Sequence, residues 1–304
     1  MLTKAGHGEK PAVSDGEYGK DRSKRIMKKN QMSVKKCVLG IAAGIAVFIF
    51  VYAIAESLFG KIAGKSTAEV LAGVVQAAAL AAVMMLFGRK DILVPSSSDS
   101  FAGGLRTGSV FFLISAGALV INTVTGIRDI GTPGVGMYDT VMWALSYLLS
   151  AGICEEFLCR GIMMNFIRST FGKNDRRSLV MSMTLSSAIF GMLHLLNLTK
   201  GDVIGTFGQV IYASGIGFYL AAVYARTNNL PFNAFLHFLF DVGMTLYDDI
   251  FVGAKESVTG SGKEPGFAFL SAGIFIAGVS LGLFLIRKKK SDICLGYHAE
   301  AVTA

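Results

Sequence analysis

The chain has 304 residues, of which 52% are hydrophobic and 16% are charged, and its mean hydropathy is +0.54. Soluble domains carry about 25% charged residues, so this chain has too little polar surface to coat a globule in water. The composition excludes a soluble enzyme and a disordered regulator and predicts a membrane protein. The net charge of +8 at pH 7 suits either nucleic-acid binding or cytoplasmic membrane loops.

A basic tail occupies residues 1–36, where ten Lys or Arg stand against four acidic residues. Such a tail is expected to be disordered and attracted to anionic lipid. The nineteen residues that follow carry no charge. This stretch exceeds the ~7–15 apolar residues of a signal peptide, so it predicts a membrane span and not a cleaved leader.

Apolar stretches recur through the rest of the chain. A helix needs about 20 mainly apolar residues to cross a membrane, and six stretches of this kind contain no charge. They are residues 37–55, 70–87, 107–124, 179–196, 203–225 and 267–286. Two further apolar stretches, 141–154 and 230–246, adjoin or contain ionisable residues, and we count them as spans as well. The sequence therefore predicts an all-α bundle of eight transmembrane helices over residues 37–286.

The basic residues indicate how these spans are oriented. With the N-terminus inside, the inner segments hold 23 of the 29 Lys and Arg residues. These segments are 1–36, 88–106, 160–178, 226–229 and 287–304. Positive charge collects on the cytoplasmic side of membrane proteins. We therefore expect a multi-pass protein of the cell membrane with both termini, including a basic tail at 287–304, in the cytoplasm. No nucleic-acid partner is then needed to explain the charge.

Small and amide side chains within the spans point to close helix packing. GxxxG spacing occurs at Gly40 and Gly44 and again at Gly278 and Gly282. This spacing lets helices approach closely in lipid, either within one bundle or across a dimer face. We favour the packing within one bundle, and the sequence leaves the oligomeric state open. Gln76 and Asn122 are expected to hydrogen-bond neighbouring helices.

Two adjacent carboxylates follow the fourth span. Ionisable residues in a membrane are costly, so each is a functional hypothesis. On a helix, Glu156 and Arg160 have the i,i+4 spacing and the order that favour an ion pair. Glu155 lies about 100° around the helix from Glu156, which leaves it free to face a cavity. The alternative is that both carboxylates extend to the cytoplasmic interface.

Two histidines lie in later spans. His194 follows an apolar stretch and is either a functional group or a helix-packing hydrogen-bond donor. His237 and Asp241 have the i,i+4 spacing within one span, as a functional or a structural pair. Together with Glu155 they give two carboxylates and two imidazoles from three helices, the donor set of a metal site or an acid–base site. Water activated by a carboxylate would make such a site hydrolytic.

Three motifs contain these residues. They are EExxxR at Glu155, Glu156 and Arg160, FxxxH at Phe190 and His194, and HxxxN/D at His237 and Asp241. In this order and on separate helices they resemble the CPBP family of CAAX proteases and bacteriocin-processing (Abi) enzymes, which includes the type II CAAX prenyl endopeptidases. The resemblance covers about residues 141–245.

The resemblance implies an intramembrane endopeptidase with a conical cavity that opens to the cytosolic side and to lipid. It assigns the water-activating base to Glu155, the positioning of water to His194, oxyanion binding to His237 and Asp241, and support of the site to Glu156 and Arg160. The substrate would be a membrane-anchored peptide, such as a CAAX-like C-terminus, another lipidated peptide or a bacteriocin leader. A role in bacteriocin immunity is also implied.

Asp241 departs from the commoner Asn of the third motif. An ionised Asp cannot donate a hydrogen bond to an oxyanion. Asp241 is therefore protonated, orients His237, or binds a metal. Members of the family have been described both as glutamate-dependent proteases and as metalloproteases, and a metalloprotease would hold zinc with Glu155, His194 and His237. The alternative outside the peptidases is a transporter or immunity protein that uses the same groups as a proton or ion relay.

Overall fold

A computed structural model describes residues 31–93, 101–171, 175–253 and 266–287. These residues form helices joined by turns and contain no strand. The first helices are α2 (Val34–Ala46), η1 (Val47–Val51), α3 (Tyr52–Phe59), α4 (Lys65–Leu86), η2 (Lys90–Leu93), α5 (Phe101–Thr107) and α6 (Ser109–Asp129). Most of the two predicted tails, 1–30 and 288–304, lies outside the described residues.

The second half carries the predicted motifs. Its elements are α7 (Met137–Tyr147), η3 (Leu148–Cys154), η4 (Phe157–Met164), α8 (Asn165–Thr170), α9 (Arg176–Leu193), η5 (His194–Lys200), α10 (Val203–Thr227), α11 (Leu230–Leu246), η6 (Tyr247–Val252) and α12 (Phe267–Leu285). Four segments have π-helical hydrogen bonding: η1 in the first half and η3, η4 and η6 in the second half. The η2 and η5 segments are 3-10 helices.

Seven helices of the described chain are long and apolar enough to cross a membrane. They are Val34–Phe59, Lys65–Leu86, Ser109–Asp129, Met137–Thr170, Arg176–Thr199, Val203–Thr227 and Phe267–Leu285. The prediction of an all-α, multi-pass membrane protein is therefore confirmed. The eighth predicted span, 230–246, is α11, which has 17 residues. The count of eight stays a prediction.

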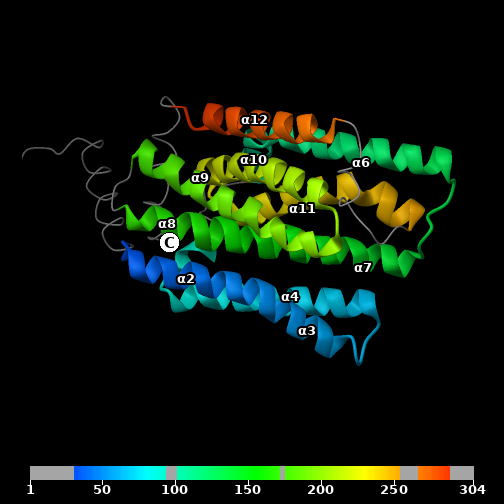
Figure 1. The fold of residues 1–304 in the computed structure, drawn as a ribbon, viewed down its shortest axis with the longest axis horizontal. Coiled ribbons are helices and arrows are strands. Elements are labelled where there is room, and N and C mark those ends of the chain that lie inside the picture. The colour runs from blue at the N-terminus through cyan, green and yellow to red at the C-terminus, as the bar shows by residue number, and fades with distance from the viewer. Residues whose placement is uncertain (1–30, 94–100, 172–174, 254–265, 288–304) are drawn as a thin grey trace, which may run out of the picture.

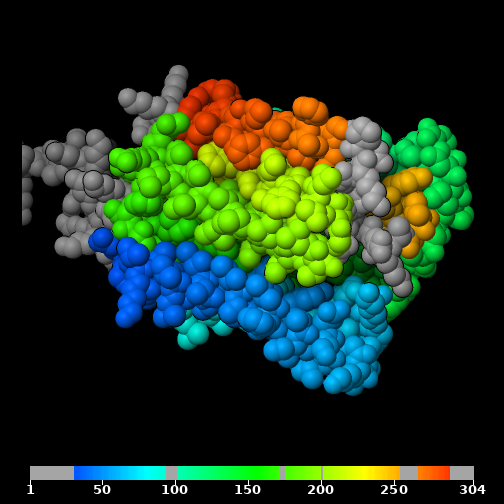
Figure 2. Space-filling view, in the orientation of Figure 1, coloured from blue at the N-terminus to red at the C-terminus, as the bar shows by residue number. Residues whose placement is uncertain are grey.

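The helices lie side by side along the long axis of the molecule (Figure 1). The α2, α3 and α4 helices form one side, and α6 and α12 lie on the opposite side. Between them run α9, α10, α11 and the long helix from α7 to α8, and the space-filling view shows the same order (Figure 2). The tightest pairs are α10 with α12, α10 with α9, and α11 with α6. The motif-bearing helices are thus the inner ones.

The helix of the fourth predicted span extends beyond the apolar stretch 141–154. We predicted an inner segment at 160–178, and the helix runs through the first part of it without a break, from Met137 to Thr170. Arg160 and Arg168, which belong to that segment, are 1% and 5% exposed. A buried acidic partner allows the helix to continue past a charge, and the cytoplasmic position of the segment stays a prediction.

Side-chain caps fix where the two helices of the second and third motifs begin. The carboxylate of Asp175 accepts a hydrogen bond from the Ser178 N–H at 2.7 Å and starts α9. The amide oxygen of Asn229 accepts one from the Phe232 N–H at 2.9 Å and starts α11. Asp and Asn are preferred at this position because they satisfy backbone donors that have no partner inside the helix. The caps therefore set the register of the helices that carry His194 and His237.

Polar bonds between helices agree with the prediction for the two amides. The Gln76 side chain donates to the Phe48 carbonyl at 2.6 Å, and that of Asn122 donates to the Gly243 carbonyl at 2.7 Å. Both bonds join different spans, as expected for polar groups in lipid.

Glycines allow the closest helix contacts. On α12, Gly278 faces the backbone of Gly215 on α10, and Gly282 faces Phe218. On α2, Gly40 faces the ring of Phe166. These neighbours belong to the same chain, so the GxxxG pairs pack helices within the bundle, as we favoured.

Gly278→Leu is expected to destabilise the fold, because its side chain would collide with the Gly215 backbone, which cannot rotate away. We expect a loss of at least about 2 kcal/mol, as for overpacked interiors, seen as a lower thermal midpoint in detergent. Gly273→Leu on the same helix is the matched control, since no atom lies within 4 Å of its added Cβ. Equal midpoints for the two variants would contradict the α10–α12 packing.

Candidate active site

The centre of the site is a buried ion pair. Glu156 Oε1 lies 2.7 Å from Arg160 Nη1, and the two side chains are 0% and 2% exposed. Arg160 also donates from Nη2 to the Gly217 carbonyl on α10 at 3.0 Å. The predicted i,i+4 pair is therefore confirmed. The alternative, that both carboxylates reach the interface, is wrong for Glu156.

Glu156 also binds two groups of α11. His237 Nδ1 lies 3.0 Å from Glu156 Oε1, and Asn233 donates from Nδ2 to Oε2 at 3.2 Å. The guanidinium of Arg160 makes Glu156 an ionised acceptor. Because a carboxylate can only accept, the His237 nitrogen that faces it must carry the proton. Glu156 therefore fixes which edge of the His237 ring faces away from it.

The opposite edge of His237 faces the other two carboxyl groups. His237 Nε2 lies 3.7 Å from Glu155 Oε2 and 3.9 Å from Asp241 Oδ2. Both distances are too long for direct hydrogen bonds but short enough for charge attraction or a bridging group. Asp241 thus faces His237, as its spacing predicted, but the short contact of His237 is with Glu156.

The charges around His237 do not balance unless the site holds protons. Glu155, Glu156 and Asp241 supply three carboxyl groups within 3.9 Å of one imidazole, and Arg160 is the cation bound to Glu156. Isolated charges are costly in a membrane interior. This environment favours an imidazolium at His237 and a proton on one of the two remaining carboxyls.

Phe190 packs against the charged and imidazole groups of the site. Its ring meets that of His194 edge to face at 5.0 Å and that of His237 at 5.8 Å. The Arg160 guanidinium carbon lies 5.5 Å from the centre of the same ring, within cation–π range. His194 Nδ1 is 3.1 Å from the Phe190 carbonyl oxygen. The second motif therefore brings both predicted histidines around one aromatic ring.

A cavity of about 180 Å³ reaches this site. Glu155 and His194 both line it, which agrees with the expectation that Glu155 faces a cavity. His237 and Asp241 are not among its lining residues, although His237 Nε2 lies 3.7 Å from Oε2 of Glu155. Asn197 of η5 adds an amide to the wall, and this amide donates to Gln209 Oε1 at 2.8 Å. The full lining is Phe48, Glu155, Leu158, Cys159, Phe190, Leu193, His194, Leu196 and Asn197.

The two acidic residues stand between two π-helical segments. The Leu148–Cys154 segment precedes them and Phe157–Met164 follows them. The Glu155 N–H bonds to the Ser150 carbonyl, five residues back. π-Helical turns are rare and frequent at functional sites. No pattern in the sequence predicted these π-helical segments.

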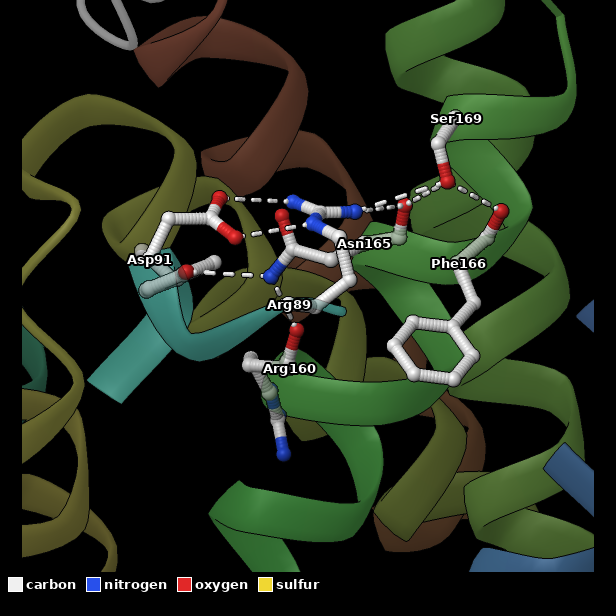
Figure 3. Close-up of polar contacts among 7 residues, drawn as sticks. Arg89, Asp91, Arg160, Asn165, Phe166 and Ser169 are labelled. Carbon is white, nitrogen blue, oxygen red and sulfur yellow. Dashed lines mark hydrogen bonds and ion pairs between the residues drawn. The ribbon is translucent and has the colours of Figure 1, made fainter. Parts of the chain in front are cut away.

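A second polar network, drawn in Figure 3, contacts the same helix. The guanidinium of Arg89 donates to both carboxylate oxygens of Asp91, at 3.0 and 3.1 Å. Asn165 donates from Nδ2 to the Arg160 carbonyl at 2.7 Å and to the Tyr224 hydroxyl at 3.0 Å. Asn165 thus ties α10 to the turn that carries Arg160. We interpret this network as structural support for the site.

A metal site would need several His, Cys, Asp or Glu side chains placed around one point. No group of three or more His, Cys, Asp or Glu among the described residues is arranged to hold a metal ion. The zinc alternative, with Glu155, His194 and His237 as ligands, therefore finds no ligand set in this part of the chain.

Comparison with known families agrees with the site. Residues 138–243, from α7 to α11, match the family model of type II CAAX prenyl endopeptidase Rce1-like proteins. The match supports an assignment to the CAAX protease family. The matched segment contains all three motifs and the side chains of Glu155, Glu156, Asp241 and Phe190 that face His237. The resemblance read from the motifs is thereby confirmed, and it supports a peptidase. No curated protein and no solved structure matches the chain.

Proposed function

We propose that this protein is an intramembrane endopeptidase that uses water activated by Glu155 to cleave a membrane-anchored peptide. One observation carries the proposal. The Glu155 carboxylate lines a cavity that it shares with His194 and lies 3.7 Å from His237 Nε2. A base, a second polar group for water and a cationic donor therefore meet at one point, as hydrolysis requires.

In the proposed reaction, a water in the cavity sits between Glu155 and His194. Glu155 removes a proton from this water while the water oxygen bonds to the peptide carbonyl carbon. The carbonyl oxygen becomes an oxyanion. When the C–N bond breaks, the proton held by Glu155 passes to the leaving amine, so the reaction consumes one water and regenerates the carboxylate.

His237 and Asp241 stabilise the oxyanion in this scheme. An imidazolium at His237 donates from Nδ1 to Glu156 and from Nε2 toward the oxyanion. Because Glu155 must be ionised to act as the base, Asp241 is the protonated carboxyl in this scheme; it faces Nε2 at 3.9 Å and can donate a hydrogen bond to the oxyanion, as an Asn would. This role accounts for an Asp where the family commonly has Asn. A preorganised donor of this kind contributes about 3 to 4 kcal/mol to acyl-transfer catalysis.

No metal takes part in the proposed mechanism, since the donors around Glu155 form no ligand set. We expect cleavage to continue at an unchanged rate after the purified protein is treated with a zinc chelator and dialysed. A hydrolase that depends on a bound metal would lose activity and regain it when zinc is added. Loss with recovery would refute the glutamate-only mechanism.

The substrate we propose is a peptide held at the membrane by a lipid or a helix, since the cavity wall includes the exposed apolar side chain of Leu196. We also propose that both termini lie in the cytoplasm of a cell-membrane protein, on the side favoured by the basic residues. The test uses the full chain in liposomes with three peptides: a prenylated CAAX C-terminus, an acylated peptide and a bacteriocin-type leader. Cleavage of one of them, located by mass spectrometry, supports the proposal. Cleavage of none, with ion uptake in the same liposomes, favours the relay.

A further inference from the structure

Asn233 lies on α11, one helical turn before His237, and belongs to none of the three motifs. Its side chain is fully buried and joins three helices. We propose that Asn233 is a positioning residue, which acts through Glu156 to hold the His237 ring with Nε2 toward Glu155 and Asp241. The inference deepens the proposed peptidase function and rests on it for its catalytic meaning.

The orientation of the Asn233 amide follows from its two partners. Its Nδ2 donates to the Leu220 carbonyl at 2.8 Å and to Glu156 Oε2 at 3.2 Å. A carbonyl and a carboxylate can only accept. Rotating the amide by half a turn would place its oxygen against both acceptors, which is strongly unfavourable in a buried site. The donor end of Asn233 is therefore held toward Glu156.

Asn233 supplies a donor to the second oxygen of Glu156. Arg160 Nη1 and His237 Nδ1 both contact Oε1, whereas Asn233 contacts Oε2. Donors prefer to lie near the plane of the carboxylate they bind. Holding both oxygens fixes that plane, and the plane sets the direction in which the Nδ1–H of His237 points.

The direction of Nδ1–H decides where the catalytic edge of His237 lies. Because the imidazole is rigid, a rotation at Nδ1 moves Nε2 relative to Glu155 and Asp241, which now lie at 3.7 and 3.9 Å. Displacements of about 1 Å at a reacting group can reduce a rate by about 100-fold. Asn233 therefore affects catalysis without touching the substrate.

Asn233→Leu in the full chain, reconstituted in nanodiscs, removes the donor with little change in volume. The first readout is nitrogen NMR of the histidine rings, with the His237 signals identified by their loss in His237→Gln. We expect wild-type protein to show one hydrogen-bonded Nδ1–H at His237. In Asn233→Leu we expect this signal to shift, because the Nδ1–H bond to Glu156 changes direction. This readout needs no substrate.

The second readout is the cleavage rate. We expect kcat to fall by up to about 100-fold, the effect that a displacement of about 1 Å at a reacting group can have, with KM unchanged. Asn122→Leu is the matched control, because Asn122 also donates to a backbone carbonyl of α11, that of Gly243, but does not contact Glu156. It should leave the His237 signals and kcat unchanged.

Unchanged His237 signals and kcat in folded Asn233→Leu would overturn the inference. If that variant does not fold, Asn233→Ser replaces it: the hydroxyl leaves room for water, and a smaller shift of the same signals is expected. Signals identical to wild type in the Ser variant would equally overturn the positioning role. Because the NMR readout is independent of activity, failure of the peptidase proposal and failure of the Asn233 role give different results.

Discussion

Glu155→Gln is expected to lower the rate of peptide cleavage by about 1,000-fold while the protein stays folded. A positioned general base contributes between about 100- and 10,000-fold, and Gln keeps the size of Glu but cannot take a proton from water. Glu155 is partly exposed to the cavity, with 23% of its side chain accessible. Its replacement should therefore cost little stability, and the measurement is a cleavage rate alongside a thermal midpoint.

The matched control for this variant is Glu69→Gln. Glu69 is a carboxylate on α4 that pairs with Lys65 at 3.8 Å and does not line the cavity. We expect Glu69→Gln to cleave at the wild-type rate. Full cleavage of every substrate by Glu155→Gln would remove Glu155 from the mechanism.

Arg160→Met is expected to destabilise the protein by about 3 to 5 kcal/mol, because it leaves the Glu156 carboxylate buried without its cation. The pair is enclosed, with side-chain exposures of 0% and 2%. Replacing both partners should be much less harmful than replacing one. We therefore expect the double variant Glu156→Gln with Arg160→Met to recover most of the stability, measured by chemical unfolding in detergent.

Activity should not recover with stability in that double variant. A neutral Gln at position 156 is a weaker partner for the His237 ring than a carboxylate. The double variant should therefore fold but cleave slowly. The losses of stability in Glu156→Gln and Arg160→Met could instead add up to the loss in the double variant. The coupling energy of the pair would then be zero, and the buried ion pair could not be the support of the site.

The sequence allowed much of the fold and site to be predicted. Apolar length predicted the spans, since every backbone group in lipid must bond within its own helix. The spacing of Glu156 and Arg160 predicted an ion pair, because this contact is local to one helix. The family resemblance, read from three short motifs, was confirmed over residues 138–243.

What the sequence did not reveal depends on contacts between helices. The bond between His237 and Glu156 spans 81 positions, and no local spacing indicates it. None of the three motifs includes Asn233, although its amide reaches Glu156 on another helix. The apolar stretch 141–154 is shorter than the helix that contains it, Met137–Thr170, because the partner of Arg160 could be inferred but not its burial. The roles of Glu155, His194, His237 and Asp241 stay predictions.

The most direct test of the central claim is a single turnover in heavy-oxygen water. The enzyme is in excess over an intact membrane-anchored peptide that it has been shown to cleave. If Glu155 activates water, the new carboxyl group of the product carries one heavy oxygen in the first turnover, and Glu155→Gln yields almost no product at the same time point. A first-turnover product without heavy oxygen, or a peptide trapped covalently on the enzyme, would contradict direct attack by water.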